Sequence, residues 1–436
     1  MSARTSRAPQ LWALLGLALL AANLRAAITS VPPLLGALQD VLGLSGAQVG
    51  ILTTLPVLCL GAFAAVAPAV AHRIGTEAAV ALALAVLTLG VALRAVPVPL
   101  CLFAGTVLAG AGIAVGNVLV PAVVKRHFPA RTGAATGIAM TLMAGSGALA
   151  AALAVPVHDA AGWRPALALW ALPALPAVLV WRRLARRARR AGAAVRAVPA
   201  ERGRSLLAAP LAWAVAGFLG VVSLMFYVLV SWLPAVMRDS GYGAAEAGLM
   251  MSVMLAIGIP LGFVVPVVAA RLSDQRPLVA GIAALKVTGM AGLLLDPGSA
   301  WVWVVVLGVA TGSAFPLAIT LLGLRSPDPV TAARLSGLAQ TFGYLVAGTG
   351  PVAIGMLHDA TGDWDRPLLV LMALAVPGTW CGLRAARPGY VGTGRPRTPV
   401  AQAVPVVPGP RSGGGRTPTP VGSPERGAGV RPSSRS

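Results

Sequence analysis

Apolar residues run through this chain in stretches long enough to cross a lipid bilayer, with short polar breaks between them. A helix needs about 20 mostly apolar residues to span the hydrocarbon core. Such stretches predict twelve spans, near residues 11–36, 47–70, 78–96, 99–124, 132–156, 165–181, 209–236, 245–270, 278–295, 299–324, 334–356 and 366–383. The pattern therefore predicts an all-α membrane protein without strands.

Polar segments at the ends of spans in the first half recur in the second half. The segment from His158 to Trp163 (HDAAGW) returns 200 residues later as the segment from His358 to Trp364 (HDATGDW). Parallel repeats of this size build many secondary transporters. We therefore expect two pseudo-symmetric six-helix halves, over residues 11–182 and 208–384.

Composition and charge agree with a membrane location. The chain is 57% hydrophobic and 11% charged, with a mean hydropathy of +0.81, which is more apolar surface than a soluble core can bury. The net charge of +21 comes from basic residues grouped at span ends and in the tail, so we expect contact with membrane lipid and no binding of nucleic acid. By the positive-inside rule, both termini face the cytoplasm and the protein lies in the cytoplasmic (inner) membrane.

The segments outside the two halves are basic and polar. Residues 1–10 form a cytoplasmic N-terminus, and residues 183–207 form a cytoplasmic linker with the features of a short amphipathic helix at the headgroups. Residues 385–436 are rich in proline, glycine, serine and arginine, a composition that predicts a disordered cytoplasmic tail.

Arg25 is the strongest candidate for a functional residue. It lies about 21 Å into the first span, at 1.5 Å of helix rise per residue, where an arginine costs about 2.5–3.5 kcal/mol. All 13 acidic residues fall in loops, tails or span ends, so no buried carboxylate is expected to neutralise Arg25. We interpret it as the ligand of a substrate anion; the alternative is an arginine that snorkels outward or pairs with a backbone carbonyl.

Other polar and aromatic residues complete the predicted substrate site. Thr29 is the i+4 neighbour of Arg25 on the same helix face, and Asn23 flanks it on the other side. The repeat places Phe226 and Tyr227 opposite Arg25, where a planar anion would fit between the guanidinium and a ring. The remaining candidates are polar groups in otherwise apolar spans, Asn117, Gln340 and Tyr344; the alternative for each is a hydrogen bond that bridges two helices.

Proton coupling stays open. Intramembrane proton relays normally use a buried carboxylate or histidine, and neither is predicted at a span centre. Coupling would use Glu246 or Asp40 near the outer span ends, or a proton carried on the substrate. Lys286 lies midway along the ninth span, which we expect to be peripheral, so we place its side chain along lipid and outside the site.

Four stretches resemble the cyanate and nitroimidazole transporter family of the major facilitator superfamily. They are Asn23 to Val31, Leu52 to Val57, Gly110 to Leu119 and Gln340 to Pro351. The resemblance implies a twelve-helix carrier working by alternating access. It also implies that the first, fourth, seventh and tenth helices line the cavity, which assigns Arg25, Asn117, Tyr227 and Phe315 to cavity-facing helices.

The superfamily's loop motif between the second and third helices is only partly kept. Arg73 and Gly75 match it, but His72 stands where an aspartate is expected and Pro68 where a glycine is expected. The equivalent loop in the second half keeps Arg271 and Asp274. We assign these four matching residues a gating role, although the substitutions argue against an intact charge clamp in the first half.

These features predict a secondary transporter of a small organic or pseudohalide anion. The alternative is an exporter of neutral or aromatic drug-like compounds such as nitroimidazoles. We expect no enzyme activity, cofactor or metal, because the sequence groups no nucleophile with a base and shows neither a phosphate-binding glycine loop nor a metal-spaced His/Cys set.

Overall fold

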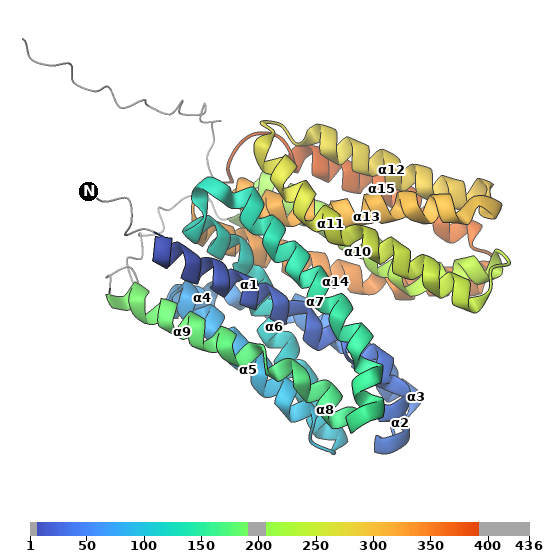
Figure 1. The fold of residues 1–436 in the computed structure, drawn as a ribbon. Helices are drawn as coiled ribbons and strands as arrows, with labels where there is room; N and C mark the ends of the chain where they lie inside the picture. The colour runs from blue at the N-terminus through green and yellow to red at the C-terminus, as the bar shows by residue number, and fades with distance from the viewer. Residues whose placement is uncertain (1–6, 191–205, 392–436) are drawn as a thin grey trace, which may run out of the picture. The chain divides into compact units, whose positions relative to one another are not determined.

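The computed structural model describes residues 7–190 and 206–391, and within these ranges every regular element is helical (Figure 1). The first half contains α1 (Arg7–Thr29), α2 (Leu35–Leu42), α3 (Gly46–Ala64), α4 (Ala67–Ile74), α5 (Thr76–Arg94), α6 (Pro99–His127), α7 (Thr132–Ala161), α8 (Trp163–Ala168) and α9 (Ala174–Arg190). The second half contains α10 (Pro210–Asp239), α11 (Ala244–Arg271), α12 (Arg276–Leu295), α13 (Ala300–Leu324), α14 (Pro329–Thr361) and α15 (Asp365–Ala385).

The observed helices follow the predicted spans. Ten of the helical segments in the described ranges are long and apolar enough to cross a membrane, and α3 with α4, bent by 50°, makes an eleventh. The 33-residue α14 is long enough to be the twelfth. The all-α, twelve-helix prediction is confirmed, with α9 continuing as a helix through the first eight residues of the predicted linker, to Arg190.

Two predictions lie outside the described residues. The amphipathic character assigned to the linker falls largely on residues 191–205, and the disorder assigned to the tail falls almost entirely on residues 392–436.

The repeated segments that end α7 and α14 have the same structural role. Gly162 and Gly362 cap the two helices with positive φ angles of 87° and 72°, a conformation that favours glycine. Their N–H groups donate to the carbonyls of His158 and His358, respectively. Trp163 and Trp364 follow, and both are buried. The repeat therefore preserves a helix C-cap and a buried tryptophan that follows it.

Glycines let neighbouring helices approach closely, as in other membrane bundles. The contact between α5 and α6 brings backbone against backbone. A Cβ placed on Gly90 would lie 2.7 Å from the Gly105 carbonyl oxygen, and one on Gly112 would lie 2.5 Å from the Ala83 carbonyl oxygen. Both contacts are with backbone atoms, so a side chain here could be accommodated only by moving a helix.

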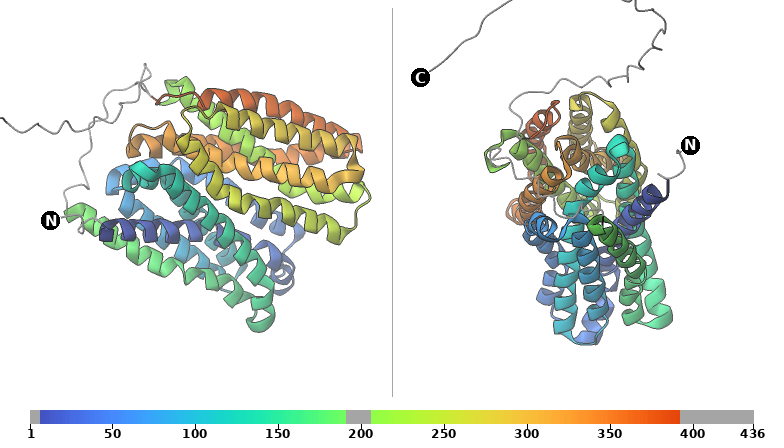
Figure 2. Two further views of the ribbon diagram at one scale, coloured as in Figure 1. Left: turned by 45° about the horizontal axis from the view of Figure 1, so that its top comes forward. Right: turned by 90° about the vertical axis from the view of Figure 1, so that its left-hand side faces the viewer.

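The two halves lie side by side (Figure 2) and meet most closely at the end where α1 begins and α15 ends, which we call the terminal end. At the contact between α7 and α11, a Cβ placed on Gly133 would lie 2.5 Å from the nearest atom of the opposite helix. The same distance is 2.9 Å for Gly137 and 3.4 Å for Gly262. At the contact of α14 with α3 and α4, the distance from an added Cβ to the nearest atom is 2.7 Å for Gly337 and 3.9 Å for Gly348. Both interfaces loosen with distance from the terminal end.

Candidate functional site

Arg25 lies on α1, partly buried, with its side chain packed against α7. A Cβ on Gly147 would lie 2.6 Å from Arg25 Cγ, so the glycine provides the space that the arginine stem occupies. One turn further along α1, the Thr29 hydroxyl donates to the Gly147 carbonyl oxygen at 2.8 Å. Arg25 and Thr29 are thus held against the same short stretch of α7.

Aromatic residues of the second half complete this environment. Tyr227 on α10 and Tyr344 on α14 both lie within electrostatic range of Arg25. The ring of Phe226 packs edge-on against Tyr227, with centroids 5.4 Å apart. Arg25 of the first half therefore lies within electrostatic range of two tyrosines of the second half, while the contact given for Phe226 is with Tyr227.

Gln340 ties the two halves together near this site. Its Nε2 donates to the Asn117 backbone carbonyl oxygen at 3.3 Å and to Ser336 Oγ at 2.7 Å. The Gln340 side chain is almost fully buried, whereas Asn117 is partly exposed. Of these two predicted residues, Gln340 is occupied by helix contacts, and Asn117 keeps the more accessible side chain.

The hydrogen bonds of Asn23 do not link it to Arg25 or to the residues around Arg25. It is buried, and its Nδ2 donates to the Leu19 carbonyl oxygen at 2.7 Å and to the Pro173 carbonyl oxygen at 3.2 Å. These bonds join α1 to the segment that precedes α9, inside the first half.

No carboxylate pairs with Arg25 within the described ranges. The ion pairs there join Glu77 to Arg126 and His127, and Asp274 to Arg276. Glu77 is a buried acid, but it lies in the first turn of α5 and its charge is already met by Arg126 at 2.7 Å. The guanidinium of Arg25 is therefore a positive charge about midway along the apolar span Gln10–Leu42, without a protein counter-charge in the described structure.

Arg94 is a buried cation that sequence reasoning missed, because it lies at the end of a span and reads as a loop residue. It is 2% exposed, and it donates to the Ala27 carbonyl oxygen at 2.5 Å and to Thr106 Oγ1 at 3.1 Å. Ala27 follows Arg25 by two residues, so Arg94 fixes the end of α1 that carries the candidate ligand.

The prediction for Lys286 was wrong. The residue is 4% exposed and does not lie along lipid. Val279 and Gly289, which share its helix face, contact Gly382 of α15 and Leu307 of α13, respectively. That face of α12 points into the second half. The sequence does not show which face of the ninth span is buried, so the prediction of a peripheral span placed Lys286 wrongly.

The predicted gating residues have different surroundings. Gly75 has a φ of 90° and joins α4 to α5. Arg73 and Arg271 are exposed, and their side chains form no hydrogen bond or ion pair with the rest of the described chain. Asp274 pairs with its neighbour Arg276 at 2.6 Å. Hydrogen bonds from the Arg276 side chain and backbone hold the pKa of the Asp274 carboxyl below its usual value.

Gly147→Ala should weaken substrate binding while leaving the bundle intact. The added methyl group would meet Arg25 Cγ and displace the guanidinium, and a misplacement of about 1 Å can cost about 100-fold in activity. Gly145→Ala on the same helix is the matched control, since nothing lies within 4 Å of its Cβ position. Uptake kinetics of both variants check this; equal uptake by the two would show that Gly147 does not position Arg25.

Comparison with known proteins agrees with this architecture. The sequence matches the Major Facilitator Superfamily over residues 14–351. It is 37% identical to the 2-nitroimidazole transporter of Escherichia coli (strain K12) over 374 residues, covering 85% of this chain and 94% of that protein. It is 30% identical to the cyanate transport protein CynX of the same organism over 371 residues, covering 83% and 95%. Among solved structures, the proton:xylose symporter XylE has a similar fold, with a TM-score of 0.68 at 13% identity, covering 86% of this chain and 94% of that chain.

The helical bundle with its repeated halves defines a multi-pass membrane transporter. The chain belongs to the major facilitator superfamily. Its similarity to the cyanate and nitroimidazole transporters, predicted from short motifs, is confirmed over most of its length.

Proposed function

We propose that this transporter moves a small planar organic or pseudohalide anion across the cytoplasmic membrane by alternating access. The observation that supports this most directly is Arg25, a guanidinium about midway along the apolar span Gln10–Leu42, whose charge no described carboxylate neutralises. A planar anion can accept two parallel hydrogen bonds from such a group. The similarity to a protein named for cyanate transport agrees with this class of substrate.

The closer packing of the two halves at the terminal end supports alternating access. If the terminal end is cytoplasmic, as the basic residues predict, this arrangement closes the cytoplasmic side and leaves the opposite side looser. The transport cycle then requires these interfaces to separate and the opposite ones to close.

The alternative substrate is a neutral aromatic compound such as a nitroimidazole. The rings of Phe226, Tyr227 and Tyr344 favour it, and one relative is named for 2-nitroimidazole. An organic cation is disfavoured because Arg25 would repel it. A stability screen of the purified protein against small anions, nitroaromatics and cations separates the three classes, since a ligand that binds only the folded state raises the unfolding temperature. Stabilisation by cations alone would contradict the proposal.

Uptake should depend on pH without requiring any single carboxylate. Glu246 accepts a hydrogen bond from Trp301 Nε1 at 2.9 Å, and Asp40 is exposed, so neither lies beside Arg25 as a dedicated relay. We expect Glu246→Gln and Asp40→Asn to keep proton-dependent uptake, as a proton carried on the substrate would allow. Proton flux measured with uptake in vesicles checks this, and one amide variant that transports without moving protons would overturn it.

A further inference from the structure

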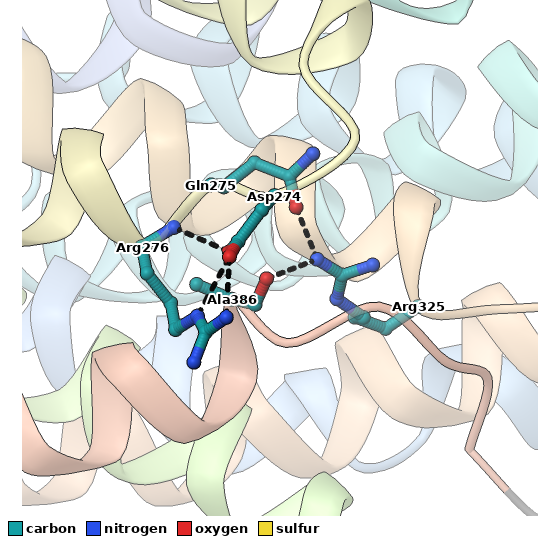
Figure 3. Close-up of polar contacts among 5 residues, drawn as sticks. All are labelled: Asp274, Gln275, Arg276, Arg325 and Ala386. Carbon is teal, nitrogen blue, oxygen red and sulfur yellow. Dashed lines mark hydrogen bonds and ion pairs between the residues drawn. The ribbon is translucent and has the colours of Figure 1, made fainter. Parts of the chain in front are cut away.

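Arg325 joins the ends of three helices at the terminal end of the second half (Figure 3). It follows α13 directly and is buried. Its Nε donates to the Ala385 carbonyl oxygen at 2.7 Å, and its Nη2 donates to the Ala386 carbonyl oxygen at 2.8 Å and to Gln275 Oε1. Gln275 in turn donates to carbonyl oxygens at the end of α11. One guanidinium therefore links α11, α13 and α15.

The charge of Arg325 persists despite its burial. Desolvation lowers the pKa of its guanidinium to about 10, and the nearby Asp274 and Tyr390 act in the opposite direction. A group with this pKa is still protonated at neutral pH. It is therefore suited to hold the carbonyl groups that α15 leaves unpaired at its C-terminus.

The segment that follows α15 turns back over α13. The Val391 N–H donates to the Arg325 backbone carbonyl oxygen at 2.8 Å, and the Val391 side chain is 3% exposed. The preceding ring, that of Tyr390, lies 5.6 Å from Nζ of Lys125. Lys125 belongs to α6 in the first half, so this segment of the second half reaches a side chain of the first.

Lys125 also contacts the second half directly. Its ammonium donates to the Gly323 carbonyl oxygen in the last turn of α13 at 3.2 Å and interacts electrostatically with Asp328, which caps α14. A cation is favoured at the C-terminus of a helix and over an aromatic ring. One lysine is thereby held by three groups of the opposite half.

We propose that residues 386–391 form a latch that holds the terminal end of the transporter closed. Arg325 is its anchor, because it binds the segment to the second half, and Lys125 of the first half contacts the segment through Tyr390. The contacts of Arg325 lie within the second half and survive a rigid movement of that half. The contacts of Lys125 cross between the halves and break when α6 separates from α13. The inference rests on the alternating-access cycle of the proposed function, in which this end opens once per turnover.

The latch predicts a change in the ratio of open to closed molecules at the terminal end. Tyr390→Ala removes the ring while leaving the hydrogen bonds of Arg325 in place, and we expect about a two- to five-fold shift toward the open state, the size of a cation–π contact at an exposed site. Lys125→Met removes the ring contact and the bond to Gly323 together and should shift the ratio further. Tyr390→Phe and Lys125→Arg keep the ring and the charge, respectively, and should retain most of the closed population.

Distances between spin labels on Ala130 and Ser273 measure this ratio, because both residues are exposed and flank the contact between α7 and α11. The full chain would carry these labels with Cys59, Cys101 and Cys381 replaced by serine. Thermal unfolding of each variant establishes that it is folded before its distances are compared. The latch is supported if Tyr390→Ala and Lys125→Met lengthen the distance while Tyr390→Phe and Lys125→Arg do not.

The outcomes separate the latch from the transport mechanism. If the parent chain populates two distances and both disruptive variants keep its ratio, the latch is wrong and alternating access stands. If the parent chain keeps a single distance with and without transported substrate, alternating access itself fails, and the latch with it.

Discussion

Arg25→Ala reduces uptake to the background of empty vesicles while the protein still inserts and folds. The guanidinium is the candidate partner of the substrate's negative charge, and the described chain offers no carboxylate that its removal would leave unpaired. Charged hydrogen bonds contribute about 1.5–3 kcal/mol each, so losing a bidentate pair weakens binding by a factor of about 100 or more. Uptake of radiolabelled substrate by reconstituted protein, normalised to inserted protein, is the measurement.

Two further variants show whether the loss is specific. Arg25→Lys keeps the charge but not the planar fork, so it should restore uptake only partly. Arg238→Ala removes an exposed arginine from the end of α10 and should leave uptake unchanged. Uptake at the parent level by Arg25→Ala would remove Arg25 from the substrate site.

Gly90→Ala destabilises the bundle because it forces α5 away from α6. Its Cβ would clash with the Ala109 nitrogen and lie 2.7 Å from the Gly105 carbonyl oxygen, both of them backbone atoms of α6. Overpacking of this kind costs about 1–3 kcal/mol, which exceeds the gain of about 0.5–1 kcal/mol from replacing a glycine within a helix. The unfolding temperature of the purified protein should therefore fall.

Gly281→Ala is the matched control for this effect. Gly281 also lies inside a spanning helix, α12, but nothing lies within 4 Å of its Cβ position. Only the helix-propensity gain applies, so its unfolding temperature should stay level or rise. An unfolding temperature for Gly90→Ala equal to that of Gly281→Ala would show that α5 and α6 are not packed through this glycine.

Most of the fold could be predicted because it depends on patterns that the sequence carries directly. Long apolar stretches indicate membrane-spanning helices, and the repeated segments ending at Trp163 and Trp364 indicate the duplication. The repeat survives because a cap with positive φ needs Gly162 and Gly362. The resemblance to known transporters followed from similarly local motifs.

The candidate site was predicted in part, for reasons that differ among its residues. Arg25 could be identified because a charge deep in an apolar span is costly, and pseudo-symmetry then pointed to Phe226 and Tyr227. Gly147 escaped notice because its role is the space it leaves for Arg25, and such space depends on how α1 packs against α7.

The buried cations near helix ends could not be assigned in the same way. Arg94 and Arg325 occupy positions where most arginines are solvated, and only the packing of other helices buries them. Their partners are largely backbone carbonyl groups, which leave no signature in the sequence. Lys286 was misplaced because the face that α12 turns toward its neighbours depends on tertiary packing.

The role of Arg25 is tested most directly by the binding of a planar anion and of its neutral isostere, such as an aromatic carboxylate and the corresponding amide. Affinities of both compounds would be measured by calorimetry for the parent protein and for Arg25→Ala. We expect the parent protein to prefer the anion by a factor of about 10 or more, as one charged hydrogen bond of about 1.5 kcal/mol would give, and we expect this preference to vanish in Arg25→Ala. Equal affinity of the parent protein for the two compounds, or an undiminished preference for the anion in Arg25→Ala, would contradict the assignment of Arg25 as the anion ligand.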